Sequence, residues 1–115
     1  MSTANQKVLA RVGHMLEAIR HANSDIEGMS LEQFLADGKS QRAVNDSIIV
    51  IGEAANRVMQ AATQLKHDRA TFWEQLQYAN GMRNMLAHEY FRVDAAIVWA
   101  TVKNNLPELG DHLTA

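Results

Sequence analysis

The strongest constraint on the fold of this chain is the spacing of its apolar residues, which recur every three or four positions as they do along one face of an α-helix. The first such stripe includes Val8, Val12 and Ile19 and predicts an amphipathic helix from about Asn5 to His21. Runs of β-branched residues, which favour strands, are nearly absent, and the chain has only one proline. We therefore expect an all-α fold.

Polar residues that can cap helix ends divide the next part of the chain. Ser30 with Gln33 forms a capping-box signature, which predicts a short helix as far as Ala36. Ser40 is the expected N-cap of a long helix, which we expect to be the central element of the fold. The apolar residues that recur at helical spacing along this helix are Val44, Ile48, Ile51, Ala55, Val58, Met59 and Ala62.

Two further helices are expected in the second half of the chain. Lys66–Arg69 has the composition of a charged connection, and Thr71 with Glu74 forms another capping-box signature ahead of a fourth helix. Asp94 is placed to cap a last helix, which Pro107 should bring towards its end because proline lacks a backbone N–H. Four substantial helices with short connections predict a mainly up-and-down four-helix bundle with one extra short helix.

The length of the chain predicts a single domain. At 115 residues it has room for one hydrophobic core, so we expect one domain over residues 1–115 and no separate cofactor lobe. The longest apolar stretch is far shorter than the roughly 20 residues of a membrane span, and the N-terminal sequence has no apolar signal core. We therefore expect a soluble, cytoplasmic protein with no membrane partner.

Several classes of site are excluded or disfavoured by composition. The absence of cysteine excludes a disulfide framework, a thiol nucleophile and a zinc site with sulfur ligands. His14 and His21 lie seven positions apart near one helix face, but no third ligand is evident, so we expect no metal site and no cofactor. The formal net charge of -2 provides no global basic field, so any contact with RNA must be local or shared with a partner.

The residues with the most chemical potential lie close together in the fourth helix and just after it. Arg83, His88 and Tyr90 form the pattern R-x4-H-x-Y, and Asn84 directly follows the arginine. Many helices satisfy R-x4-H by chance, with an Arg bonded to carbonyl groups at a helix end and a His in a packed turn. The pattern alone therefore leaves a structural role open.

Helical geometry complicates a shared site for this pattern. At about 100° per residue, five positions rotate His88 about 140° away from Arg83, whereas seven positions bring Tyr90 back within roughly 20° of it. Two alternatives follow: the helix ends or distorts between Leu86 and His88, or Arg83 of one chain works with His88 of another. Both make dimerisation plausible.

The surrounding sequence resembles a known family of helical ribonucleases. The motif stands within GMRNMLAHEYF at positions 81–91, with GEA at 52–54 upstream, Phe72-Trp73 between them, and Val98-Trp99 and Leu106-Pro107 downstream. This combination covers most of the chain and resembles the HepT branch of the HEPN superfamily, the toxin half of type VII toxin–antitoxin pairs. HepT-like chains often have a proline shortly before the tryptophan, where this chain has Arg69-Ala70-Thr71-Phe72.

The resemblance implies a homodimer in which two such motifs face each other across a cleft and cut RNA as a metal-independent endoribonuclease. In that reaction a neutral His88 would take the proton from a ribose 2′-hydroxyl, and a protonated imidazole would supply the leaving 5′-oxygen. Arg83 offers a fixed fork of donors for the phosphoryl oxygens, and Asn84 would add a donor or hold the arginine. Glu53 would either orient Arg83 from the central helix or lie at a surface or an interface.

The resemblance also implies that Tyr90 accepts AMP from a partner protein, a minimal nucleotidyltransferase antitoxin. An adenylyl group would add an anion and a bulky base beside the cationic cleft and so silence the ribonuclease. The alternative for Tyr90 is a packing ring with a bonded hydroxyl. For the whole chain, the alternatives are a non-enzymatic helical subunit that serves a separately encoded nucleotidyltransferase, or a bare dimerisation bundle.

Overall fold

The computed structural model describes residues 3–115, and this part of the chain is helical and contains no strand. The prediction of an all-α fold is confirmed. In chain order the helical elements are α1 (Thr3–Asp25), α2 (Leu31–Leu35), α3 (Gly38–Ala61), α4 (Leu65–Asp68), α5 (Ala70–Glu89), the 3-10 turn η1 (Tyr90–Arg92), α6 (Ala95–Ala100), the π turn η2 (Thr101–Asn105) and α7 (Leu106–Thr114).

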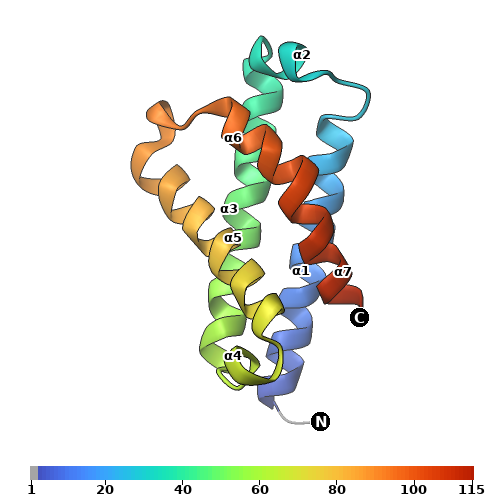
Figure 1. Ribbon diagram of the computed structural model, residues 1–115, viewed down its shortest axis with the longest axis vertical. Helices are drawn as coiled ribbons and strands as arrows, with labels where there is room; N and C mark the ends of the chain where they lie inside the picture. Colours follow the sequence, from blue (N-terminus) through green and yellow to red (C-terminus); the bar gives the residue numbers. More distant parts are fainter. Residues whose placement is uncertain (1–2) are drawn as a thin grey trace.

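The central element is α3, which packs against α1 on one side and α5 on the other (Figure 1). The segment from α6 to α7 descends across the bundle and contacts α1 and α5, so that four long helical segments alternate in direction (Figure 1). The short α2 covers one end of the bundle, and α4 forms the turn between α3 and α5. The expected up-and-down bundle with a short extra helix is therefore present, with α4 as a second short helix.

The core combines the apolar stripes that the sequence pattern predicts with further residues such as Phe34 and Leu109, which no predicted stripe includes. The largest side chains that are almost fully buried in it are Phe34, Met15, Ile48, Ile51, Leu76, Leu86 and Leu109. Phe34 of the short α2 reaches this core and packs against Trp99, with 5.3 Å between the ring centroids. The short helix is thereby fixed to the C-terminal segment.

Two of the predicted helix caps are confirmed, and one is replaced by a neighbour. The backbone N–H of Gln33 donates to Ser30 Oγ at 3.1 Å, and the backbone N–H of Ser30 donates to the Gln33 side-chain oxygen Oε1 at 2.8 Å. These two bonds complete the capping box of α2. Asp94 Oδ1 accepts from the amide of Ala96 at 2.9 Å and caps α6. The cap of α3 is Asp37 and not Ser40, because α3 begins at Gly38.

The carboxylate of Asp37 is held in its charged form by this cap. The Ser40 hydroxyl donates to Asp37 Oδ2 at 2.9 Å, and the amides of Lys39 and Ser40 donate to Oδ1. These hydrogen bonds, that from the Ser40 hydroxyl first, lower the pKa of Asp37 below its usual value. Ser40 thus supports the cap from inside the helix.

Other expected boundaries are wrong. The Thr71–Glu74 capping box is absent: α5 begins at Ala70 without a side-chain cap. Arg69, directly before it, instead lies over the Phe72 ring and donates to a carbonyl of the C-terminal helix at 3.0 Å. The charged connection 66–69 is mostly the helical turn α4, and α1 extends beyond the predicted bounds at both ends.

Pro107 does not bring the last helix to its end, contrary to the prediction. It lies in the first turn of α7, which continues to Thr114. The preceding π turn explains this, because the amide of Leu106 already bonds to the carbonyl of Thr101, five residues back. A first-turn proline is tolerated where the helical hydrogen-bond pattern is already interrupted.

Two kinds of feature are absent from residues 3–115. No helix there combines the length and apolarity needed to cross a membrane. No group of three or more histidine and acidic side chains in this part of the chain is close enough together to hold a metal ion.

Candidate active site at the crossing of α3 and α5

The site is built on an unusually close approach of two helices. A Cβ atom placed on Gly52 of α3 would lie 2.2 Å from the Cβ of Arg83 and 2.6 Å from the carbonyl oxygen of Ala79, both on α5. Only glycine fits this position, because real Cβ atoms do not approach other atoms so closely. The contact brings the next residue of α3, Glu53, within reach of the arginine side chain.

The guanidinium of Arg83 is held by two side chains. One terminal nitrogen donates to Glu53 Oε2 at 2.9 Å, and the other donates to Asn84 Oδ1 at 2.9 Å. Glu53 also accepts, through Oε1, from Nε of Arg57 at 3.1 Å. The Arg83 side chain remains 33% exposed, so an anion from solvent can reach part of it.

Two neighbours of Arg83 contact its guanidinium. Glu53 does so from the central helix, and its side chain is 36% exposed. Asn84 presents its carbonyl oxygen to the guanidinium, so within the described residues it holds the arginine. The structure therefore brings together Arg83, Asn84 and Glu53.

His88 does not join this cluster within one chain. The α5 helix is continuous from Ala70 to Glu89, so the alternative of a helix that ends or distorts between Leu86 and His88 is wrong. His88 is exposed in a shallow surface hollow with Glu89, Tyr90 and Arg92, and among residues 3–115 no hydrogen bond or ion pair joins it to Arg83. On an unbroken helix the two side chains project about 140° apart.

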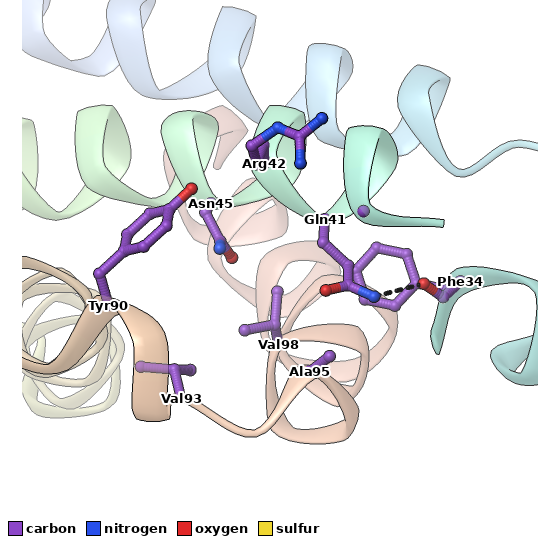
Figure 2. Close-up of a pocket in the computed structure, with 9 residues that line it drawn as sticks. Phe34, Gln41, Arg42, Asn45, Tyr90, Val93, Ala95 and Val98 are labelled. Carbon is purple, nitrogen blue, oxygen red and sulfur yellow. Dashed lines mark hydrogen bonds between the residues drawn. The ribbon is translucent and has the colours of Figure 1, made fainter. Parts of the chain in front are cut away.

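Tyr90 lies outside α5, which changes its expected position. The helix ends at Glu89, whose φ of -132° and ψ of 35° break the helical path, and Tyr90 begins a 3-10 turn. Tyr90 therefore does not continue the helix that carries Arg83, and the seven-position spacing does not by itself place the two side chains on one face. Its side chain is 37% exposed, and its hydroxyl points toward α3 (Figure 2).

The Tyr90 ring forms one wall of a pocket between α3 and the η1–α6 segment. The pocket has a volume of about 280 Å³, and Figure 2 shows Arg42 and Asn45 on its α3 side and Val93 and Val98 opposite. At its far end Gln41 donates to the carbonyl of Phe34 at 2.9 Å, which joins α3 to α2. Tyr90 thus faces a mixed apolar and polar hollow.

Sequence reasoning missed two features of this region. Gly52 was noted only as part of the GEA motif, and no structural role was predicted for it. A glycine inside a long helical pattern is itself a signal of close packing. The Arg42 and Asn45 side of the pocket had no sequence signal, because these residues follow the polar pattern of an ordinary helix surface.

Comparisons with known proteins show which sequences this chain is similar to. A family model described as "Ribonuclease HepT-like" matches residues 15–115. The chain is 33% identical over 96 residues to "Putative RNase TTE0752" of Caldanaerobacter subterraneus subsp. tengcongensis, a match covering 84% of this chain and 81% of the relative. It is 31% identical over 109 residues to "Probable ribonuclease HepT" of Thermococcus cleftensis, covering 95% of this chain and 92% of the relative. No solved structure matches the chain.

Proposed function

The chain belongs to the HepT-like ribonuclease family, and from that premise we propose that it is a metal-independent endoribonuclease with Arg83 and His88 as its catalytic residues. The observation that carries the proposal is the guanidinium of Arg83, which Glu53 and Asn84 hold while it stays accessible. Oriented charged donors of this kind stabilise the charge that develops on phosphoryl oxygens in a transition state.

The active unit in this proposal is a homodimer. Because α5 is unbroken, Arg83 and His88 of one chain face different directions, and a second copy is needed to bring a histidine to each arginine. Exposed apolar side chains flank the cluster, with Val50 one turn before Glu53 on α3 and Met85 next to Asn84 on α5. They give a second copy apolar surface to cover.

The chemistry follows from the side chains. The neutral imidazole of His88 takes the proton from a ribose 2′-hydroxyl, and the 2′-oxygen forms a bond to the adjacent phosphorus. The bond from phosphorus to the 5′-oxygen breaks, and a protonated His88 of the second copy gives that oxygen its proton. The products are a 2′,3′-cyclic phosphate and a 5′-hydroxyl, and DNA is not cut because it lacks the nucleophile. General acid–base catalysis of this kind contributes about 10² to 10⁴ in rate.

We further propose that the protein is the toxin of a toxin–antitoxin pair and that a minimal nucleotidyltransferase antitoxin silences it. The antitoxin would transfer AMP from ATP to the Tyr90 hydroxyl, with pyrophosphate as the leaving group and the hydroxyl proton released. The position of the Tyr90 ring supports this, because it is partly exposed and lies two residues from His88. An attached phosphodiester would place a negative charge and a purine close to the histidine.

Cleavage of RNA by the isolated protein tests the proposal. Protein never exposed to a transferase is incubated with labelled RNA and EDTA, beside His88→Ala, Arg83→Ala and a control, His67→Ala, which changes an exposed histidine on α4. We expect wild type and His67→Ala to cut RNA with 2′,3′-cyclic phosphate ends, and the other two variants to be inactive. Equal RNA products from wild type and folded His88→Ala would contradict the proposal and favour the non-enzymatic subunit.

A further inference from the structure

A basic groove lies away from Arg83, between the first half of α1 and the second half of α3. It is a hollow of about 500 Å³. Its polar lining residues are Lys7, Arg11 and His14 of α1 and Arg57 and Gln60 of α3. Their spacings of three and four positions place each set in a row on its helix, so that the two rows form the walls of the groove.

Of the three Lys and Arg side chains that line the groove, Arg57 is paired with Glu53, whereas Lys7 and Arg11 have no ion pair in the described part of the chain. The groove has no acidic lining residue, and in the part of the chain that the structure describes Lys7, Arg11 and His14 form no ion pair. Lys7 and Arg11 are like charges at positions i and i+4, an arrangement that disfavours a helix. With a net charge of -2 for the whole chain, this is a local concentration of positive charge suited to an anion.

The groove is connected to the candidate active site through Glu53. This carboxylate accepts from Arg83 with one oxygen and from Arg57 with the other, so Arg57 links the groove to the Arg83 cluster. The Arg57 atom in this contact is Nε. From Glu53 to Gln60 the helix rises about 10 Å, which corresponds to roughly three phosphates of a stacked strand at about 3.4 Å each.

We propose that this groove binds the sugar–phosphate backbone of the substrate RNA beside the scissile bond. The proposal rests on the proposed ribonuclease function and adds the surface that holds the substrate. Lysine and arginine contacts to phosphates position a nucleic acid without reading its sequence. Apolar walls from Val8, Ala10 and Ala61 allow ribose to pack between the charges. The groove thus explains how a chain of net negative charge holds a polyanion.

Equilibrium binding tests the groove independently of catalysis. A labelled single-stranded RNA is titrated, over a range of salt concentrations, with three proteins that all carry His88→Ala. The parent protein carries this substitution alone. The groove variant adds Lys7→Gln and Arg11→Gln, and the control adds Arg20→Gln and Lys39→Gln. Both pairs remove two positive charges, but Arg20 and Lys39 are exposed outside the groove. Thermal melts confirm that every variant is folded.

The salt dependence gives a quantitative expectation. Each phosphate contact contributes about 0.7 to the slope of log K against log salt for a single strand, so loss of two contacts lowers the slope by about 1.4. We expect this change in the groove variant and none in the control. The proposal would be overturned if the groove variant kept the slope and affinity of its parent, or if its loss of RNA affinity equalled that of the control. Either result would leave the groove to an acidic protein partner.

Substrate length separates the groove from the catalytic site. With His88 intact, we expect wild type to cut a long RNA faster than a ribodinucleotide and the Lys7→Gln/Arg11→Gln pair to lose this preference for the long RNA. If wild type cuts no RNA, the ribonuclease proposal fails while the binding series still decides the groove. If wild type cuts and the groove variant keeps the preference for the long RNA, the groove proposal alone fails.

Discussion

Replacement of Gly52 by alanine is the sharpest test of the crossing that builds the site. In most helix interiors this change is stabilising, because alanine favours the helix by about 1 kcal/mol over glycine. At Gly52 the new methyl group would meet the Cβ of Arg83 at 2.2 Å and the Ala79 carbonyl oxygen at 2.6 Å. Both are fixed parts of α5, so a rotamer change cannot relieve the clash.

The magnitude follows from these distances. Carbon atoms pack at about 3.5 Å or more, so α3 and α5 must separate by roughly 1.3 Å at the contact of 2.2 Å. Overpacking of this kind costs about 1 to 3 kcal/mol, which equals or exceeds the gain in helix propensity. We expect Gly52→Ala to lower the free energy of unfolding by up to about 2 kcal/mol, the balance of those two contributions. The separation should also lengthen the contact between Glu53 and Arg83.

The assay is chemical denaturation of Gly52→Ala beside a matched control, Gly81→Ala. Gly81 lies within α5, and a Cβ atom placed on it would have no neighbour within 4 Å, so alanine there should stabilise by about 0.5 to 1 kcal/mol. The two substitutions should therefore have opposite signs. If Gly52→Ala is as stabilising as Gly81→Ala, the close crossing of α3 and α5 is incorrect.

Three further predictions concern other parts of the molecule. Glu53→Ala should lower kcat for RNA cleavage by up to about 10²-fold because it releases Arg83. Glu53→Gln can still accept the hydrogen bond from Arg83 and should retain most activity. Equal losses in the two variants would contradict a positioning role. Phe34→Ala should lower the free energy of unfolding by about 3 to 5 kcal/mol because this ring is fully buried. Leu35→Ala, at an exposed position, should change it by about 0.5 kcal/mol or less, and urea denaturation would show whether the two differ. Because the folded state lowers the pKa of Asp37, its stabilising contribution is complete above the usual Asp value of about 3.9 and is lost as pH falls through the lower folded value. Thermal melts from neutral to acid pH should therefore show a smaller loss over that acid range for Asp37→Asn than for wild type, and identical pH profiles would argue against the cap.

Much of the fold was predictable because helical periodicity is local. The stripes that include Val12, Ile48 and Leu76 identify the faces that α1, α3 and α5 bury, and those faces meet in the core. Boundaries were less predictable, since a cap depends on where the chain turns. Asp37 caps α3 because the chain turns three residues earlier than Ser40 suggests, and a π turn lets the last helix continue past Pro107.

By itself the sequence determined the helical class, the buried faces and the residue types available for chemistry, with Arg83, His88 and Tyr90 close together along the chain. Only the tertiary structure decided which partners they meet. Glu53 reaches Arg83 across thirty positions, and Arg57 faces Lys7 across a groove. Periodicity identifies the face that a helix buries, but it leaves open the crossing angle and axial offset of two packed helices, and those two quantities determine which distant side chains touch.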